Sequence, residues 1–448
     1  MGELTSLLEG GRAEEALPDK KPLYSEAEAR AEAERCLYCT DAPCIQACPT
    51  EIDIPTFIKK IASGNVRGSA RTILEQNLLG YSCSRVCPVE ELCAGSCVYV
   101  GWGREPIAIG RLQRFATETV LAEPTKSPGL RALYTPKPKI GKRVACIGGG
   151  PASLAFAGYL ALEGVDAVVL EKRAIAGGLN ATGIAPYKLH AAEAVREVEW
   201  VLDLGIELRR NVSVGEGGVR GAQLLTEYDA VFVGVGLGED SRLGVPGEDG
   251  PGVIGAVDWI ERMKLDPKTD KPRGRVVVVG GGNTAIDVAR ECAQLGAQDV
   301  VMVYRRTRDA MSGYAHELAA ARKEGVRLLE QAVPVEVIRR QGALVAVRLA
   351  RTEGGRPVPG TEWELACDQI IVAIGQSKLR AIAGELPGVE LDAKGCVVAD
   401  AATGQTGNPR VFAGGDCVNG GKEVVNAVAD GRNAARHLIA QWKGSSNG

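Results

Sequence analysis

The sequence predicts an α/β protein in which a helical N-terminal domain precedes two tandem domains built on parallel sheets. Eight of the thirteen cysteines fall within the first hundred residues, where apolar positions follow helical spacing. A strand, a glycine-rich turn, a helix and a second strand occupy residues 143–171, and the same order returns about 130 residues later. Two copies of this unit, separated from the cysteines by a proline-rich stretch, indicate three domains in all.

Composition excludes several classes of partner. The 448 residues, 47.1 kDa, allow roughly two to four domains. With 53 Lys and Arg against 56 Asp and Glu, a net charge of -3 gives no reason to expect nucleic acid or an anionic membrane. The charged N-terminus lacks an apolar signal segment, and no stretch approaches a membrane span. We therefore expect a cytoplasmic protein, where clustered thiols are metal ligands more often than disulfides.

The N-terminal elements follow from capping and breaker signals. Residues 25–35 read as a helix that Ser25 opens, and Glu28 completes a capping box. Residues 49–82 show two short helices joined by a turn of glycine and asparagine. Four prolines in residues 123–142 predict an extended, semi-rigid linker.

The first glycine turn has the features of a dinucleotide site. Gly148 and Gly150 hold the first two positions of GxGxxG, where the backbone approaches a pyrophosphate at a helix N-terminus. Ser153 holds the third position, where its hydroxymethyl group slightly loosens the packing of helix on strand. Glu171 ends the second strand, where a carboxylate accepts hydrogen bonds from ribose hydroxyls. Strand, turn, helix, strand and acid in this order predict a bound dinucleotide.

The second glycine turn predicts a nicotinamide nucleotide. Gly280, Gly282 and Ala285 follow a strand, but no acid ends the next one. Arg305 and Arg306 stand there instead, and a guanidinium matches a 2'-phosphate in shape and charge. This pattern favours NADP(H) over NAD(H). The competing interpretation is that both arginines are a solvated strand end.

The C-terminal region resembles flavoproteins with two tandem dinucleotide folds. A strand leads to Gly415 and Asp416, and a helix begins near Glu423, as in the motif whose Asp contacts the flavin ribityl chain. Residues 232–239 and 370–376 are similar to the crossover strands of such proteins. FAD is therefore expected on the first unit, which is split in sequence. The expected boundaries are 1–140 for the helical domain with its linker, 141–250 with 376–448 for the FAD domain, and 251–375 for the NAD(P)H domain.

The N-terminal cysteines form two quartets. The first is Cys36-x2-Cys39-x4-Cys44-x3-Cys48-Pro49, and the second is Cys83-x3-Cys87-Pro88-x4-Cys93-x3-Cys97. Thiolates in such runs, with a closing Cys-Pro, favour iron–sulfur clusters over the alternative of structural zinc, which usually shows two CxxC pairs. The later cysteines are expected to be small core residues: Cys146, Cys292, Cys367, Cys396 and Cys417. Because residues 98–448 contain no CxxC, a flavin disulfide reductase is disfavoured.

Residues 36–120 carry a more specific resemblance. Their DAPC, Cys-Pro and GRLQRF elements are similar to the N-terminal cluster domain of the dihydropyrimidine dehydrogenase family, including its separate bacterial NAD(P)H-oxidising subunits. The small subunit of glutamate synthase is a close relative of that family. The similarity runs from about residue 30 to the C-terminus. It implies a helical domain with two 4Fe-4S clusters before two Rossmann-like domains in a flavoprotein disulfide reductase-like arrangement.

The resemblance also implies ligands. One cluster would be held by Cys36, Cys39, Cys44 and Cys97, and the other by Cys48, Cys87, Cys93 and Gln113. Cys83 would then bind no iron, although counting alone makes it the eighth ligand. The FAD contacts would be Gly148, Gly150, Pro151, Ala152, Ser153, Glu171, Lys172, Gly178, Leu179, Lys188, Val212, Gly415, Asp416 and Val424. The NAD(P)H contacts would be Gly280, Gly282, Asn283, Thr284, Arg305, Arg306, Ala373 and Gly375.

One segment departs from the family pattern. The family's GIP-x-[FY]-[RK]-L-P appears here as residues 183–190, GIAPYKLH. Lys188 keeps the basic position, while Ala185 and His190 replace the two prolines. The chain contains only three histidines, but hydride transfer to a flavin needs stacking and orientation more than acid–base groups, so no catalytic side chain is assigned.

The family implies an electron-input subunit. NAD(P)H would reduce FAD, and the clusters would pass single electrons to a partner. Uracil or thymine reduction in this family occurs at an FMN in a (β/α)8 barrel, for which 448 residues leave no room, so a separate FMN subunit in a heteromer is expected. Alternatives are a glutamate synthase small subunit, the large subunit of an electron-bifurcating NADH-dependent ferredoxin:NADP oxidoreductase, and a scaffold without turnover.

Overall fold

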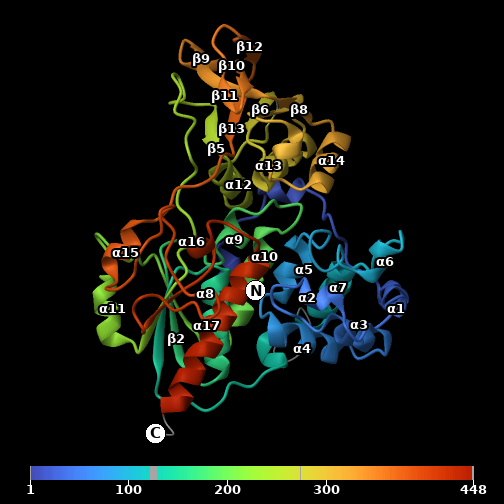
Figure 1. Ribbon diagram of the computed structural model, residues 1–448, viewed down its shortest axis with the longest axis vertical. Coiled ribbons are helices and arrows are strands. Elements are labelled where there is room, and N and C mark those ends of the chain that lie inside the picture. Colours follow the sequence, from blue (N-terminus) through green and yellow to red (C-terminus); the bar gives the residue numbers. More distant parts are fainter. Residues whose placement is uncertain (1, 122–128, 273, 446–448) are drawn as a thin grey trace.

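The computed structural model describes residues 2–121, 129–272 and 274–445. Figure 1 shows the helical N-terminal part beside the first sheet and the second sheet above both. This arrangement confirms the predicted fold class. Among the described helices, none combines the length and the apolar character that crossing a membrane requires.

Short helices pack into the N-terminal part. Ser25 caps the first of them, and its capping box with Glu28 is formed as predicted. The two helices expected between Cys48 and Cys83 are present, and Asn65 caps the second. The helices are η1 (Thr5–Leu7), η2 (Ala13–Ala16), α1 (Glu26–Glu34), α2 (Pro43–Gln46), α3 (Ile54–Ala62), α4 (Val66–Gln76), α5 (Gly80–Val86), α6 (Val98–Gly101) and α7 (Ile109–Leu121).

The predicted linker lies partly outside the described residues. Its described part begins at residue 129 and contains the short helix η3 (Leu130–Ala132). Residues 133–142 then run to the first strand without helix or strand.

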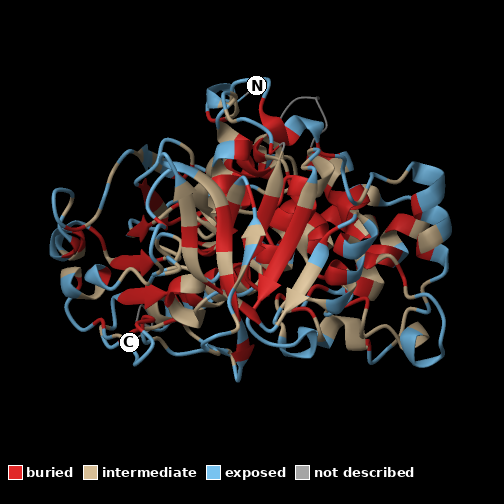
Figure 2. Ribbon diagram, turned by 90° about the horizontal axis from the view of Figure 1, so that it is seen from above, coloured by how far each residue is buried: buried red, intermediate tan, exposed pale blue. Residues whose placement is uncertain are grey.

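The first sheet is parallel, in the order β14-β4-β1-β2-β3. Its strands are β1 (Arg143–Ile147), β2 (Asp166–Glu171), β3 (Glu207–Arg210), β4 (Ala230–Val233) and β14 (Val411–Ala413). Phe156 of α8 stacks on Phe232 of β4 at 4.5 Å between ring centroids, and Figure 2 shows the central strands buried. The helices of this part are α8 (Pro151–Leu162), α9 (Leu179–Thr182), α10 (Ala191–Leu202), α11 (Gly221–Glu227), α15 (Ala381–Glu385), α16 (Asp416–Asn419) and α17 (Val424–Ser445).

The second sheet repeats this design in the order β5-β13-β6-β7-β8. Its strands are β5 (Val253–Gly255), β6 (Arg275–Val279), β7 (Asp299–Tyr304), β8 (Arg327–Glu330) and β13 (Gln369–Val372), with helices α12 (Ala256–Leu265), α13 (Asn283–Gln294), η4 (Arg308–Ala310) and α14 (Ala315–Lys323). A small antiparallel sheet, which the sequence did not predict, lies beside it. That sheet comprises β9 (Ala332–Arg340), β10 (Ala343–Glu353), β11 (Arg356–Pro357) and β12 (Trp363–Ala366).

The two chain crossings between the sheets lie side by side. Asp240 and Gln376 form an antiparallel bridge. The Ser377 amide donates to the Glu239 carbonyl at 2.8 Å, and the Gly238 amide donates to the Ser377 carbonyl at 2.9 Å. The predicted crossover segments therefore form a two-stranded ribbon.

Candidate functional site

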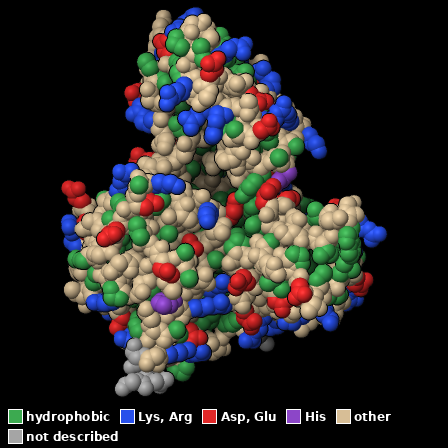
Figure 3. All heavy atoms as spheres, in the orientation of Figure 1, with side chains coloured by type: hydrophobic (Ala, Val, Ile, Leu, Met, Phe, Trp, Pro, Cys, Tyr) green, Lys and Arg blue, Asp and Glu red, His purple; other side chains and the backbone are tan. Residues whose placement is uncertain are grey.

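A large pocket lies where the N-terminal helices and the two parallel sheets meet. Its volume is about 1090 Å³, and Figure 3 shows the molecular surface hollowed between the upper lobe and the two lower ones. This exceeds the usual range for a drug-sized ligand. We call it the central pocket.

The first glycine turn forms one wall of the central pocket. Gly148 has φ +92°, and a Cβ there would stand 2.6 Å from the Gly234 carbonyl oxygen, so a side chain is excluded. Helix α8 starts after Gly150 without a side-chain cap, which leaves its amides free for an anion. The Glu171 carboxylate accepts from the Gly149 amide at 2.7 Å and faces the pocket. This donor set fits a dinucleotide.

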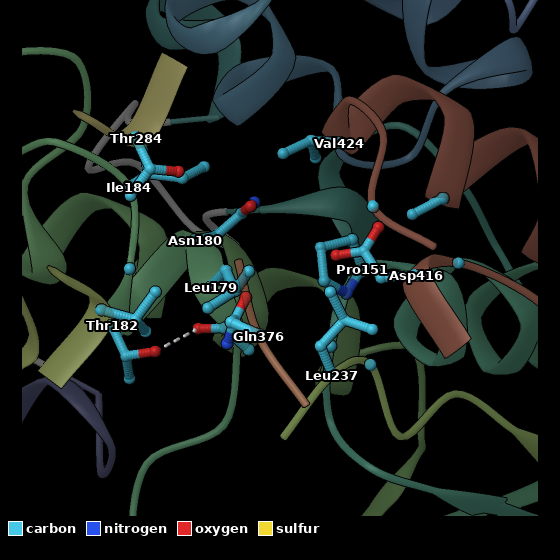
Figure 4. Close-up of a pocket in the computed structure, with 18 of the residues that line it drawn as sticks. Pro151, Leu179, Asn180, Thr182, Ile184, Leu237, Thr284, Gln376, Asp416 and Val424 are labelled. Carbon is cyan, nitrogen blue, oxygen red and sulfur yellow. Dashed lines mark hydrogen bonds between the residues drawn. The ribbon is translucent and has the colours of Figure 1, made fainter. Parts of the chain in front are cut away.

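The C-terminal motif contributes another wall. Asp416 and Pro151 both point into this part of the pocket, and Val424 opens helix α17 at its edge (Figure 4). Burial raises the pKa of Asp416, while the Lys422 amide donates to it at 3.2 Å. A buried carboxylate at this point needs a hydroxyl partner, which the ribityl chain of a flavin has.

Most residues predicted for the first unit line the central pocket. These are Gly148, Gly150, Pro151, Ala152, Glu171, Lys172, Gly178, Leu179, Lys188, Gly415, Asp416 and Val424. Two do not. Ser153 is fully buried, its hydroxyl has no hydrogen-bond partner, and it fills the space beside Gly234. Val212 follows β3 and donates its amide to the Glu171 carbonyl at 3.0 Å.

The second glycine turn meets the pocket only at its helix. Asn283, Thr284 and Gly375 line the cavity, whereas Gly280, Gly282 and Ala373 do not. A Cβ on Gly280 would stand 2.2 Å from the Ala373 carbonyl oxygen. The first glycine of this turn therefore also leaves no room for a side chain.

The two arginines predicted to recognise the nicotinamide nucleotide lie away from the central pocket. Arg305 and Arg306 are exposed after β7, and neither forms an ion pair with a described carboxylate. Their free guanidinium groups retain the capacity to bind an anion arriving from solvent.

Four cysteines from distant segments surround a second, smaller cavity, which we call the cysteine pocket. It is lined by Cys36, Cys39, Cys44 and Cys97, and otherwise by apolar side chains such as Leu37 and Ile58. This is the set predicted for one cluster. Burial raises the pKa of the Cys44 thiol to about 12, so bound iron would have to displace its proton. Four thiols in an apolar cavity fit a 4Fe-4S cluster.

The other four cysteines of the two quartets lie near one another. Cys93 interacts electrostatically with Cys87, Cys48 and Cys44. Cys87 lines the central pocket, and Cys83 is hydrogen-bonded to it. Gln113 is buried, and its amide donates to the Gly80 carbonyl at 2.7 Å.

No group of three or more His, Cys, Asp or Glu side chains among the described residues is placed to hold a single metal ion. Because a cluster binds each of its ligands through a different iron atom, its ligands stand further apart than those of one ion. The five later cysteines are all buried, as predicted.

Two family profiles match the chain. Residues 13–125 match the 4Fe-4S cluster domain II of dihydropyrimidine dehydrogenase, and residues 142–431 match the pyridine nucleotide-disulphide oxidoreductases. The chain belongs to the pyridine nucleotide-disulphide oxidoreductase family. It is accordingly an NAD(P)H-dependent oxidoreductase that uses FAD and 4Fe-4S iron–sulfur chemistry.

Curated relatives in this family cover nearly the whole chain. The glutamate synthase [NADPH] small chain of Escherichia coli K12 is 35% identical over 94% of this chain and 96% of its own length. The NAD-dependent dihydropyrimidine dehydrogenase subunit PreT of the same organism is 36% identical over 96% and 98%. Both are subunits of larger enzymes by name.

Solved structures of other proteins share the fold. Thioredoxin reductase of T. acidophilum covers 67% of this chain with a TM-score of 0.54 and 21% identity, and 98% of it is matched. FprA of Mycobacterium tuberculosis in complex with NADPH covers 69% of this chain with a TM-score of 0.54 and 22% identity, and 86% of it is matched.

An ionic network that the sequence did not predict lines the central pocket. Lys188 contacts Asp287 of α13 at 2.7 Å and Glu317 of α14 at 3.3 Å, and Lys20 reaches Glu317 at 2.5 Å. Burial alone would raise the pKa of Glu317, but Lys188 and Lys20 hold it at about 2. Asp287 also accepts from the Tyr187 hydroxyl. In sequence these residues resemble solvated charges.

The segment that departs from the family pattern is held by a buried lysine. Lys264 of α12 donates to the carbonyls of Asn180, Ile184 and Leu189 at 3.0, 3.0 and 2.8 Å. His190, in place of the second proline, precedes α10, and its amide donates to the Glu193 carboxylate at 3.3 Å. Helix α12 thereby gives this segment the rigidity that the two prolines of the family pattern would otherwise supply.

Proposed function

We propose that this chain is an electron-input subunit that oxidises NAD(P)H and delivers electrons to a separate partner subunit. The observation that carries the proposal is the extent of the central pocket. It runs from the first glycine turn to the start of α13 and to the loop that begins at Cys87. One cavity therefore borders two dinucleotide sites and a cysteine of the iron–sulfur part.

FAD occupies the first unit in this proposal. The α8 amides would hold its pyrophosphate, Glu171 its ribose and Asp416 its ribityl chain. When bound, the flavin accepts two electrons as hydride and releases them singly to iron–sulfur clusters. The chain's own contribution is to orient both nucleotides and to keep water from the junction, and Lys188 with Asp287 fixes α13 against the flavin side.

The nicotinamide nucleotide is NADP(H) rather than NAD(H) in this proposal. Arg305 and Arg306 are unpaired with described acids and stand at the strand end that reads the 2' position. An anaerobic titration of the holoprotein with NADPH and NADH should bleach the flavin. A preference for NADH of tenfold or more would contradict the arginine assignment.

We infer two 4Fe-4S clusters. The cysteine pocket would hold the cluster of Cys36, Cys39, Cys44 and Cys97, and Cys48, Cys87 and Cys93 would share the other with Gln113. Iron analysis should give about eight irons per chain, and about one or two zinc ions instead would contradict the model. Gln113→Ala should alter one EPR signal while Cys83→Ala alters neither. The reverse result would assign Cys83 as the ligand.

The partner and substrate follow from relatives rather than from this site. Reduction of uracil or thymine on a partner with FMN is our first proposal, because residues 36–120 carry the DAPC and GRLQRF elements of the pyrimidine family. A glutamate synthase partner is the second proposal, favoured by a relative of nearly equal identity. Affinity capture of the holoprotein from its native host should recover an FMN subunit. Recovery of a large glutamine-hydrolysing subunit instead would support the second proposal.

A further inference from the structure

Residues 12–21, which we call the strap, contact every part of the molecule. Glu14 accepts from the Ala191 amide at 2.9 Å, and Lys20 donates its amide to the Tyr187 carbonyl at 2.9 Å. Asp19 pairs with Arg114 of α7 at 2.5 Å. The strap therefore holds its two neighbouring lysines in fixed places.

The two lysines differ in their partners. Both line the central pocket. Lys20 forms an ion pair with Glu317 at 2.5 Å. The Lys21 ammonium instead donates to the Cys87 carbonyl at 3.1 Å, and no described carboxylate lies within 4 Å of it. A Cβ on Gly110 of α7 would stand 3.9 Å from that ammonium, so the charge lies between the Cys87 loop and the helix that carries Gln113.

We propose that Lys21 is a positioning charge that raises the reduction potential of the iron–sulfur site containing Cys87. The inference rests on the proposed function, because it requires a cluster on that cysteine. One-electron reduction of a cluster adds one negative charge, and a nearby cation stabilises the reduced form more than the oxidised one. Lys21 thereby favours electron transfer out of the central pocket.

The test is an anaerobic redox titration of the purified holoprotein, followed by EPR. A unit charge acting over about 10 Å at an effective dielectric constant of about 20 changes an equilibrium constant by about tenfold. We expect Lys21→Met to lower the equilibrium constant for reduction of one cluster by about tenfold, or about 59 mV for one electron. Lys21→Arg, the matched control, retains the charge and should keep the wild-type potential.

An unchanged potential in Lys21→Met, or an equal decrease in Lys21→Arg, would overturn the inference. If Lys21→Met loses its iron, Glu90→Gln replaces it, because Glu90 and Lys21 attract each other across the pocket. Removing this negative charge should raise the same potential, and no change would refute the role of Lys21. A wild-type protein without reducible clusters would refute the proposed function itself. Two reducible clusters whose potentials do not change in Lys21→Met would refute this inference alone.

Discussion

Glu197 of α10 accepts hydrogen bonds from the start of helix α5 in the N-terminal part. We expect its removal to weaken the contact between these two helices. Its carboxylate accepts from the Tyr81 amide at 2.9 Å and the Ser82 amide at 3.1 Å, as well as from the Ser82 hydroxyl. Helix α5, which leads to Cys87, has no side-chain cap of its own. Glu197 therefore provides the hydrogen bonds that this buried helix start requires.

The cost of Glu197→Ala follows from the groups it would leave unpaired. Two buried amides that lose their acceptor cost about 1.5 kcal/mol each, so the free energy of unfolding should fall by about 3 kcal/mol. Glu197→Gln keeps an oxygen for the amides and an amide donor for the Ser82 hydroxyl. This matched variant should stay within about 1 kcal/mol of the wild type.

The same residue predicts a pH dependence. Burial raises the pKa of Glu197 from 4.5 to about 7, so the folded protein binds a proton that the unfolded chain releases. Its contribution to stability should thus decrease as pH rises from about 4.5 to about 7, by about 3 kcal/mol in total. Urea unfolding at pH 5 and pH 8, followed by circular dichroism, measures this change. An identical pH dependence in wild type and Glu197→Gln, or a loss below about 1 kcal/mol in Glu197→Ala, would refute the reasoning.

Three further changes test the central pocket. Gly148→Ala should empty it of flavin, because the new methyl group would meet the Gly234 carbonyl at 2.6 Å; flavin absorbance per chain after purification measures this, and full occupancy would contradict it. Lys264→Met should abolish a rise in stability between about pH 8 and 10.5, because burial lowers the pKa of Lys264 to about 8 and the folded protein binds fewer protons there; urea midpoints across that range decide. Asp287→Asn should slow flavin reduction by NADPH about tenfold in stopped flow without changing flavin content, since it weakens the contact with Lys188 that fixes α13. An unchanged rate would show that this contact does not orient the nucleotide.

The sequence predicted the parts of the fold whose signals are local. Both glycine turns, the Ser25 capping box and the start of α17 after Glu423 depend on neighbours in the chain. The family resemblance predicted that Cys97 shares a cluster with Cys36, Cys39 and Cys44. The structure places these four thiols around one pocket. Spacing alone had grouped Cys97 with Cys83.

Other features of the structure were not predicted from the sequence. The hairpin of β9 and β10 has a readable signal, since Gln341 and Gly342 both have positive φ at a two-residue turn between alternating strands. The strap had none, because Lys20 and Lys21 read as a solvated charge run in a stretch of the sequence with little periodicity. Their partners Glu317 and Cys87 are supplied only by tertiary packing.

Because the two chain crossings form one ribbon, the segment that carries the second sheet begins and ends at adjacent points. It is therefore an insertion into the first domain. Because Glu239 and Ser377 are already hydrogen-bonded across the ribbon, a turn of about two residues would reconnect the chain without the 137 intervening positions. The shortened protein would keep the eight N-terminal cysteines, the strap and the first glycine turn in one chain. It would also lose Lys264 and Asp287, the groups that grip residues 180–189 from outside. The excised protein would thus separate flavin retention from nucleotide oxidation as two independently measurable properties.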